Sequence, residues 1–294
     1  MINELVAMHC YPSDHVLQLL TYCLKPPCLV FTYMENGSLE DKLHNDPWSP
    51  PLTWAYRAKI ALGTAKALCH LHGNNIVHGD IKSSNILLDK YFEPKIGDFG
   101  TVAVLYKNQS PETHVTLDSI AGTRYYLPEE YLQGIFKKQV RRPVDVFSFG
   151  IVLFEMISGK RPNEIVDSMK ETTLRRFVDT MYNNLPGTLV LPDGFIADVD
   201  KDGTSPFKII RPTGIVDTNW PHFLYQIASL CTNKEYGHRP AMEAVFNEIN
   251  CVYESHELNK NEDGEVSQKS VDMKECPSVT ITSSSLSFPI NFRN

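Results

Sequence analysis

The sequence of 294 residues lacks a long apolar run, an excess of basic residues and paired cysteines. A segment that spans a bilayer needs roughly 18 or more uninterrupted apolar residues. The most apolar segment, residues 144–157, contains Asp145, Ser148 and Glu155, so we expect a buried helix and no membrane insertion. The formal net charge of −7 argues against a protein that binds nucleic acid by neutralising its phosphates.

The cysteines are scattered and contain no CxxC pair. This pattern predicts reduced thiols, as in a cytosolic protein, and no zinc site. Cys28 and Cys69 stand in apolar surroundings, so we expect them to be small core residues. His70 and His72 fall at the end of a predicted helix, where they are expected to cap the helix and interact with its dipole. The first ten residues have no basic lead-in, so no secretory signal is expected.

Apolar periodicity predicts a short β segment followed by helices. Residues 16–33 form two apolar runs around Lys25-Pro26-Pro27, which is typical of a hairpin. Residues 52–72 have apolar side chains at helical spacing and are followed by Gly73, a common helix stop. Further helices are expected at 145–158, 171–183 and 219–254, the last one broken near 233–240. Beyond residue 256 the charged, Ser-rich sequence has too little apolar surface to offset chain entropy.

Two polar motifs stand close together in the middle of the chain. HGDIKSSNILLD, residues 78–89, contains Asp80, Lys82 and Asn85, and KIGDFG, residues 95–100, contains Asp98. In this order they resemble the catalytic loop and the magnesium-binding loop of protein kinases. Each motif alone is compatible with a chance turn, because Asp and Asn are common in turns. The two together, with three further matches, favour the kinase interpretation.

The chemistry of phosphoryl transfer explains these residue types. Mg²⁺ neutralises the phosphates of ATP and prefers hard oxygen ligands. The resemblance implies that Asn85 and Asp98 hold the metal. It also implies that Asp80 orients the attacking hydroxyl and that Lys82 steadies the transferred γ-phosphoryl group. ATP and Mg²⁺ are therefore the expected cofactors, and a protein is the expected substrate.

Three further segments resemble parts of the kinase fold. Leu127-Pro128-Glu129 occupies the place of the Ala-Pro-Glu element, and Glu129 is expected to form a buried ion pair with Arg239. Asp145 stands at the start of the expected central helix, where its carboxylate would bind the backbone of the catalytic loop. The third segment, residues 28–43, resembles the strand and hinge that grip adenine.

The adenine-binding residues follow from the same resemblance. Phe31 would be the gatekeeper, and the backbone of Met34, next to Tyr33 in the hinge, would pair with the base. Leu87 would lie under the adenine ring.

Lys82 and Thr123 favour serine/threonine specificity, because in that class the two side chains hydrogen-bond around the catalytic Asp. More narrowly, HGDIK, NILLD, PKIGDFG, YLPEEY and VDVFSFGIVLFE resemble the Pelle and interleukin-1-receptor-associated kinase family, most closely its insect members, from Glu4 to Val252. The family implies a cytoplasmic kinase of Toll signalling in innate immunity or development, recruited by adaptor proteins. None of this pathway is visible in composition or spacing.

Gly79 precedes the expected catalytic Asp80. In most regulated kinases an Arg stands there and pairs with a phosphate on the activation loop. Glycine cannot make that pair. We therefore predict that the protein is not switched on by one phosphate held at this position, although Thr113, Thr116 and Ser119 lie in the loop.

The sequence contains no GxGxxG loop and no VAIK-type lysine. Glu4 aligns with the helix Glu that would pair with that lysine, so the chain resembles an N-terminally truncated kinase. Two functions stay open. The intact catalytic motifs favour an active Ser/Thr kinase, of which this is most of the catalytic domain. The missing phosphate loop favours a catalytically weak or inactive kinase-like scaffold.

These observations predict an α+β, protein-kinase-like fold with a mostly helical C-lobe and only a remnant of the β-rich N-lobe. We expect an N-lobe remnant at 1–34 (the end of helix C, strands 4 and 5 and the hinge), a C-lobe at 35–255 and a disordered tail at 256–294. Residues 198–203, DVDKDG, resemble the start of a calcium loop, but Ile209 stands where that loop needs Glu, which favours an acidic surface loop. The basic run 137–142 is expected to be solvated rather than to dock an acidic partner.

Overall fold

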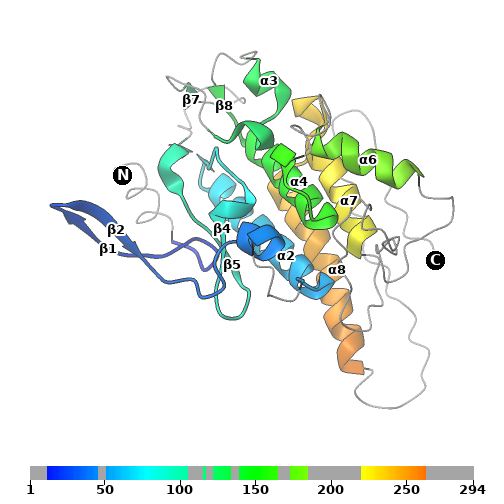
Figure 1. Ribbon diagram of the computed structural model, residues 1–294, viewed down its shortest axis with the longest axis horizontal. Coiled ribbons are helices and arrows are strands. Elements are labelled where there is room, and N and C mark those ends of the chain that lie inside the picture. Colours follow the sequence, from blue (N-terminus) through cyan, green and yellow to red (C-terminus); the bar gives the residue numbers. More distant parts are fainter. Residues whose placement is uncertain are drawn as a thin grey trace.

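The computed structural model describes residues 12–45, 51–104, 115–116, 122–133, 139–164, 173–184 and 220–262. Figure 1 shows a helical body from which one β-hairpin projects. Within these ranges the strands form two-stranded antiparallel sheets only, which confirms the predicted α+β class with little sheet. None of the helices in these ranges combines the length and apolar character that crossing a bilayer requires.

The hairpin consists of β1 (Leu19–Leu24) and β2 (Pro27–Phe31), which confirms the two strands predicted within 16–33. It is attached to the body by backbone hydrogen bonds on both sides of Val16. The N–H of Leu17 donates to the carbonyl of Ile96 (2.9 Å), and the N–H of Ile96 donates to the carbonyl of His15 (2.9 Å). Within the described residues, β1 and β2 pair only with each other and belong to no larger sheet.

The cysteines differ from the expectation in two places. Cys28 is exposed on the hairpin, so the prediction of a core residue is wrong there, whereas Cys69 is half-buried and packs against the core. Cys251 forms a disulfide, so the prediction that all thiols are reduced is wrong at that position. Cys23, Cys28, Cys69 and Cys231 are free thiols.

Helix α2 (Trp54–Gly73) confirms the helix predicted at 52–72. Thr53 caps its start, because the Thr53 side chain accepts a hydrogen bond from the Tyr56 N–H (3.3 Å). The N–H of Asn74 closes its last turn on the carbonyls of His70 and Leu71. Most of α2 is buried, because α4, α8 and β5 all pack against it.

Helix α4 (Arg142–Ser158) lies inside the body, as its apolar sequence predicted. It begins three residues earlier than expected, with Pro143 in its first turn, and ends at Gly159 in the left-handed conformation (φ 63°). It packs against α6 (Leu174–Asn184) and α7 (Trp220–Cys231). At Gly150 an added Cβ would lie 2.6 Å from Thr232 Cγ2, so glycine permits the close approach to α7.

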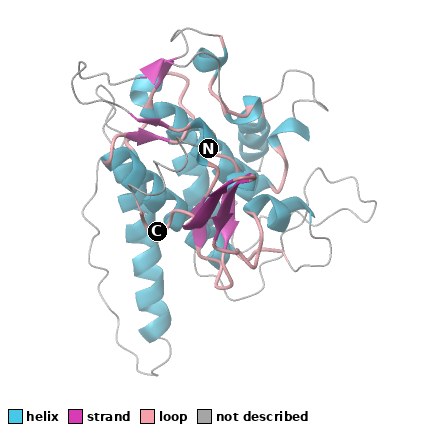
Figure 2. Cartoon of the chain, turned by 90° about the vertical axis from the view of Figure 1, so that its left-hand side faces the viewer, coloured by secondary structure: helices cyan, strands magenta, loops and turns pink. Residues whose placement is uncertain are grey.

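Helices α7 and α8 (Met242–Glu262) confirm the helical region predicted at 219–254 and its break, which lies between Cys231 and Met242. Helix α8 packs along α2 and extends beyond the body in Figure 2. It continues past residue 256, so the expected start of a disordered tail at 256 is wrong. Residues 263–294 and the predicted loop at 198–203 lie outside the described residues.

Four short strands determine where the polar motifs lie. Strand β3 (Ile76–Val77) pairs with β6 (Ala103–Val104), and β4 (Ile86–Leu88) pairs with β5 (Pro94–Ile96). The chain leaves β3, forms the 78–85 loop and enters β4; it later leaves β5, passes through Asp98 and enters β6. Both loops therefore run between the same two small sheets and lie side by side. A fourth pair joins β7 (Val115–Thr116) to β8 (Gln139–Val140).

Candidate active site

Asp145 of helix α4 binds the backbone of the 78–85 loop. Its carboxylate accepts the N–H of His78 (2.8 Å) and the N–H of Gly79 (2.8 Å). The side chain of His72, at the end of α2, also contacts it (Nε2 to Oδ2, 3.0 Å). Asp145 is fully buried, so its charge is stabilised by these three partners instead of by water. His72 was expected to act at the helix end and is instead a partner of Asp145.

Asp80 lies between Lys82 and Thr123. Lys82 Nζ donates to Asp80 Oδ2 (2.7 Å) and to Thr123 Oγ1 (3.0 Å). The other carboxylate oxygen, Oδ1, accepts both the N–H (2.8 Å) and the hydroxyl of Thr123 (2.8 Å). The loop at 122–123 is thereby bonded to the catalytic-loop motif across a large sequence separation.

The carboxyl group of Asp80 is ionised at neutral pH. Burial alone would raise its pKa, but the hydrogen bonds from Lys82 and Thr123 outweigh burial and lower the pKa below the usual 3.8. An ionised carboxylate beside an ammonium group is suited to orient a hydroxyl group and to accept its proton.

Asn85 is oriented by the same loop. Its side-chain N–H donates to the backbone carbonyl of Asp80 (2.9 Å). The backbone carbonyl of Asn85 accepts the N–H of Gly97 (2.9 Å). The amide nitrogen is thus engaged with Asp80, and the side-chain oxygen is the atom suited to a cation. The backbone bond joins Asn85 to Gly97, the residue directly before Asp98.

Asp98 occupies a left-handed backbone conformation (φ 59°), and its side chain is exposed. Phe99, the next residue, is buried and packs edge-on against His78 with ring centroids 5.0 Å apart. The Nε2 of His78 bonds the carbonyl of Gly97 (3.0 Å). Phe99 and His78 therefore anchor this loop on the 78–85 loop and leave the Asp98 carboxylate in the open. A non-glycine residue with positive φ costs energy that the surrounding packing must supply.

His78 is a neutral, buried imidazole. Burial lowers its pKa below 6.5, although the carboxylates of Asp145, Asp80 and Asp98 act in the opposite direction. Its Nδ1 accepts the N–H of Asp80 (3.3 Å), which assigns the proton to Nε2.

The segment that directly follows the predicted hinge is bonded to β4, the strand that carries Leu87. The N–H of Asn36 donates to the carbonyl of Leu88 (3.0 Å), and the N–H of Leu88 donates to the carbonyl of Gly37 (2.8 Å). Met34 is buried, Phe31 and Leu87 are half-buried, and Tyr33 is 80% exposed. The segment after β2 is thus bonded to the strand that carries Leu87. Glu4 lies outside the described residues.

The backbone conformation at position 79 favours glycine, whatever the role of an Arg at this position in other kinases. Its φ is +82°, and an added Cβ would lie 3.2 Å from the carbonyl oxygen of Thr101. Gly122, with φ +102°, also approaches this loop closely, because a Cβ there would lie 2.5 Å from the carbonyl oxygen of Gly79. The two glycines let the 78–85 loop, the Asp98 loop and the 122–123 segment meet.

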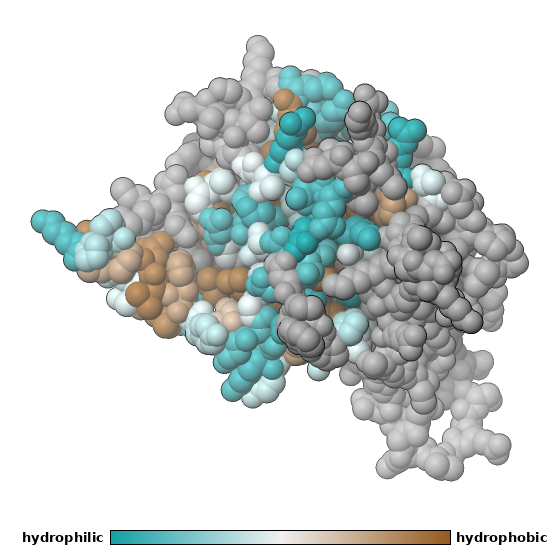
Figure 3. All heavy atoms as spheres, viewed as in Figure 1, coloured by the Kyte–Doolittle hydropathy of each residue, from teal (hydrophilic) through white to brown (hydrophobic). Residues whose placement is uncertain are grey.

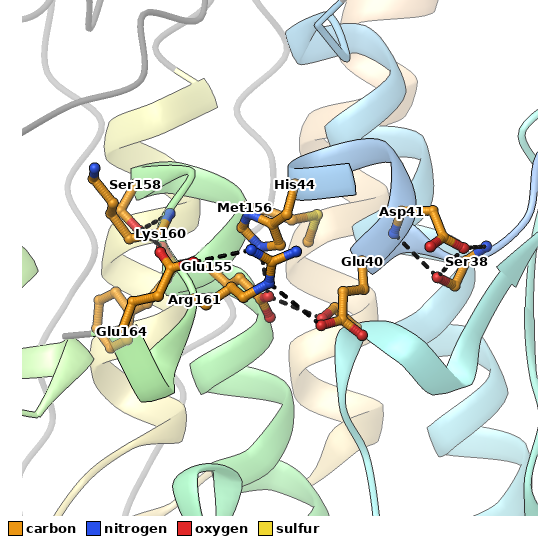
Figure 4. Close-up of polar contacts among 12 residues, drawn as sticks. Ser38, Glu40, Asp41, His44, Glu155, Met156, Ser158, Lys160, Arg161 and Glu164 are labelled. Atoms are coloured by element: carbon orange, nitrogen blue, oxygen red, sulfur yellow. Dashed lines mark hydrogen bonds and ion pairs between the residues drawn. The ribbon is translucent and has the colours of Figure 1, made fainter. Parts of the chain in front are cut away.

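A buried polar cluster, which was not predicted, joins Ser83 of the 78–85 loop to helix α4. Glu155 of α4 accepts hydrogen bonds from the hydroxyls of Ser83 (2.9 Å) and Tyr126 (2.8 Å), and it bonds His44 Nε2 (2.8 Å). Figure 4 shows His44 and Glu155 facing each other. Glu155 is fully buried. A carboxylate inside an otherwise apolar helix was the sequence signal for this cluster.

The ion pair predicted for Glu129 is formed by Glu130. Arg239 Nη2 lies 2.7 Å from Glu130 Oε1, and Arg239 also donates to the carbonyls of Asn233 (2.9 Å) and Pro143 (3.2 Å). Glu129 is exposed and bonds Gln133 within the short helix α3 (Glu129–Leu132). The prediction of Glu129 is therefore wrong by one residue.

The oxygen donors of the two loops fit magnesium. Mg²⁺ is usually bound by one or two carboxylates and completes its shell with phosphate oxygens and water. Asp98 offers an exposed carboxylate and Asn85 a neighbouring amide oxygen. The described residues contain no cluster of three or more His, Cys, Asp or Glu that would form an all-protein metal cage. The site therefore fits a metal that arrives with a phosphate ligand.

A buried Asp that binds the loop backbone, a Lys–Asp–Thr contact and an exposed Asp after a short strand are the arrangement expected for the catalytic and magnesium-binding loops of a protein kinase domain. The model of the protein kinase domain matches residues 1–248, and the chain belongs to this family.

Comparison with individual proteins gives partial matches. The Pelle-like serine/threonine-protein kinase pik-1 of Caenorhabditis elegans is 43% identical over 167 residues, which cover 54% of this chain and 34% of that protein. The serine/threonine-protein kinase pelle of Drosophila melanogaster is 40% identical over 183 residues, which cover 59% of this chain and 35% of that protein. A brassinosteroid LRR receptor kinase of Solanum lycopersicum is 35% identical over 246 residues, covering 80% of this chain and 18% of that protein. The chain thus matches about a third or less of each relative's length.

Proposed function

We propose that the chain forms most of the catalytic domain of a serine/threonine protein kinase, which transfers the γ-phosphoryl group of ATP to a Ser or Thr hydroxyl of a protein. The observation that carries this proposal is the contact of Lys82 and Thr123 with the two carboxylate oxygens of Asp80. The names of the two Pelle-type relatives, both serine/threonine kinases, support it.

The proposed mechanism assigns one task to each group. Bound magnesium would neutralise the phosphates, and Asn85 and Asp98 would hold it through their oxygens. Asp80 is ionised, so it can accept the hydrogen of the substrate hydroxyl and aim the oxygen at the γ-phosphorus. Lys82, 2.7 Å from Asp80, is placed to stabilise the negative charge of the transferred group.

We further propose that the kinase acts in the cytoplasm in a Toll-type signalling pathway and is recruited by adaptor proteins. The support is the resemblance of the catalytic motifs to the Pelle and interleukin-1-receptor-associated kinase family. The partial matches to pik-1 and pelle agree with it.

A second candidate is a kinase-like scaffold with little or no catalysis. The absence of a GxGxxG loop and of a VAIK-type lysine from the sequence favours it. Losing one preorganised charge contact to the transition state costs about 10²–10³-fold in rate. A chain without both elements would then bind partners through its helical body and transfer phosphate slowly.

Transfer of labelled phosphate from Mg-ATP to a general protein substrate tests the two candidates. An active kinase gives phosphoserine and phosphothreonine, and Asp80→Asn should lower the rate by about 10²–10⁴-fold. Asp98→Ala should abolish the dependence of the rate on Mg²⁺ concentration. Asp89→Ala is the matched control, because Asp89 lies on the same chain segment but its carboxylate accepts hydrogen bonds from the turn N–H groups of Tyr91 and Glu93. Equal, background-level labelling by wild type and Asp80→Asn would favour the scaffold.

A further inference from the structure

The hairpin places two free cysteines directly opposite each other. In the antiparallel register Cys23 of β1 pairs with Cys28 of β2, and both are exposed. Side chains of directly opposed residues in an antiparallel pair point to the same face, with Cβ atoms about 4.5–5.5 Å apart. Opposed Cα atoms are about 4.5–5.5 Å apart, which lies within the range of about 4.4–6.8 Å that a disulfide spans. A small movement of the two side chains therefore brings the sulfurs into bonding distance.

The register is well defined at this point of the hairpin. Its irregularity lies between Leu19 and Thr21, at the other end of the strands. From Thr21 to Leu24 the pairing with Pro27–Val30 is continuous. The thiol of Cys23 also donates to the carbonyl of Lys25 in the turn (3.3 Å), so its sulfur is directed toward the end of the hairpin that Cys28 shares.

Cys69 and Cys231, the other two free cysteines of the described residues, are differently placed. Cys231 is fully buried, and burial raises its pKa to about 12. Cys69 is half-buried, and burial raises its pKa as well. Reactive thiols need access to solvent and a reachable thiolate. Among the free thiols in the part of the chain that the structure describes, Cys23 and Cys28 are exposed and each has a thiol opposite it.

We propose that Cys23 and Cys28 form a dithiol modification site, which a peroxide converts into a disulfide across the hairpin and a thiol reductant restores. One thiolate attacks the O–O bond of the peroxide, becomes a sulfenic acid and releases the first water. The second thiolate attacks the sulfenic sulfur, forms the S–S bond and expels the oxygen as the second water. The two thiols lose two electrons and two protons, and the peroxide gains them. This inference does not depend on the proposed kinase activity.

The site would respond without disturbing the catalytic groups. The bridge closes around Leu24–Pro27 at the tip of the hairpin, whereas β2 ends at Phe31 and the hinge begins after it. A thiol reductant in solution can reach the disulfide and reduce it by thiol exchange, because both cysteines are exposed. The oxidised state therefore fixes the register of the hairpin that leads to the hinge.

The test treats the full chain with low equivalents of hydrogen peroxide, blocks the remaining thiols with an alkylating reagent and maps the peptide that contains both cysteines by mass spectrometry. We expect this peptide to escape alkylation, to lose the mass of two hydrogens and to regain both thiols after a dithiol reductant. Cys69 and Cys231 should stay alkylatable after unfolding.

A register-shifted variant provides the matched control. Cys28→Ser combined with Val30→Cys keeps two exposed cysteines on the hairpin but moves them to diagonal positions about 7–8 Å apart. It should form the bridge on the order of 10²-fold more slowly, because ring closure depends on alignment. Cys23→Ser and Cys28→Ser alone should stop at a sulfenic acid, trapped by dimedone. Closure at equal rates in wild type and the shifted variant, or separate oxidation of the two wild-type thiols to sulfinic acids, would overturn the proposal.

Discussion

The hairpin and the 78–85 loop invert the usual relation between polarity and burial. In the hairpin Leu20, Tyr22 and Leu24 are apolar and are 57%, 55% and 66% exposed. Figure 3 shows a hydrophobic area on the projecting hairpin. In the loop His78 and Ser83 are polar and fully buried.

The difference lies in how each segment is stabilised. Backbone pairing between two neighbouring strands forms the hairpin, and the residue pairs that define its register are all close in sequence. Side chains from distant elements bind the loop: Asp145 and Glu155 from α4, and Thr123 from the segment before α3. A buried polar segment needs such partners because each unsatisfied group costs about 1–3 kcal/mol. Substitutions should therefore be tolerated in the hairpin and costly around the loop.

The largest expected effect is at Asp145. Asp145→Ala removes the acceptor of the His78 and Gly79 N–H groups, so we expect the free energy of unfolding to fall by about 3–5 kcal/mol. Urea denaturation of the full chain measures it. Asp14→Ala is the control, since Asp14 is exposed and should change stability by less than about 0.5 kcal/mol. A loss below about 1 kcal/mol for Asp145→Ala would show that the loop backbone does not depend on this carboxylate.

The next effect separates two adjacent acids. Glu130→Gln should cost about 2 kcal/mol, because it leaves the guanidinium of Arg239, only 1% exposed, without its anion. Glu129→Gln should stay within about 0.5 kcal/mol, since Glu129 is exposed. Thermal unfolding of the two variants side by side measures the contrast. The reverse order would restore the original prediction of Glu129.

A third effect concerns the left-handed glycine of the loop. Gly79→Ala should cost about 1–2 kcal/mol, because any side chain is strained at φ +82°. Gly79→Arg should cost as much and should add a cation before Asp80. If the protein needs no phosphate at this position, phosphatase treatment will leave the phosphotransfer rate of wild type unchanged. A rate that collapses on dephosphorylation in wild type would contradict the prediction.

The pH dependence of stability tests the neutral, buried His78. Because its pKa is lower in the folded state than the unfolded value of 6.5, the unfolded chain binds the proton first as the pH falls. Stability is therefore full above pH 6.5 and decreases on acidification through that value, by about 1.4 kcal/mol for each unit of difference in pKa. His78→Phe, which keeps a ring against Phe99, should flatten the decrease between pH 7.5 and about 5.5 in urea titrations. The comparison is made in a His15→Gln background, since burial lowers the pKa of His15 too.

The smallest effect is expected in the hairpin. Tyr22→Ser and Leu24→Ser should each change the free energy of unfolding by less than about 0.5 kcal/mol, because both side chains are already exposed. Phe154→Ser in α4 is the contrasting variant and should be severely destabilising, since Phe154 is fully buried. A large loss for Tyr22→Ser would mean that the hairpin face is covered in solution.

Local patterns predicted the elements better than the contacts between them. The helices at 52–72 and 145–158 follow from apolar spacing, and the hairpin follows from two short runs around Pro26. The choice between Glu129 and Glu130 could not be made, because successive helix residues point about 100° apart and only packing decides which one faces Arg239. The contact of His72 with Asp145 and the exposure of Cys28 were missed for the same reason.

The amino-acid sequence by itself determined the catalytic motifs, their order along the chain and the helices that follow them, because short motifs and periodicity are local properties. Tertiary structure alone decided which distant groups meet. It brings Thr123 to Asp80, Asp145 to the loop backbone and Glu155 to Ser83. The physical reason is that a buried polar group needs a partner, and which partner it finds depends on how α4 packs against elements far away in the sequence.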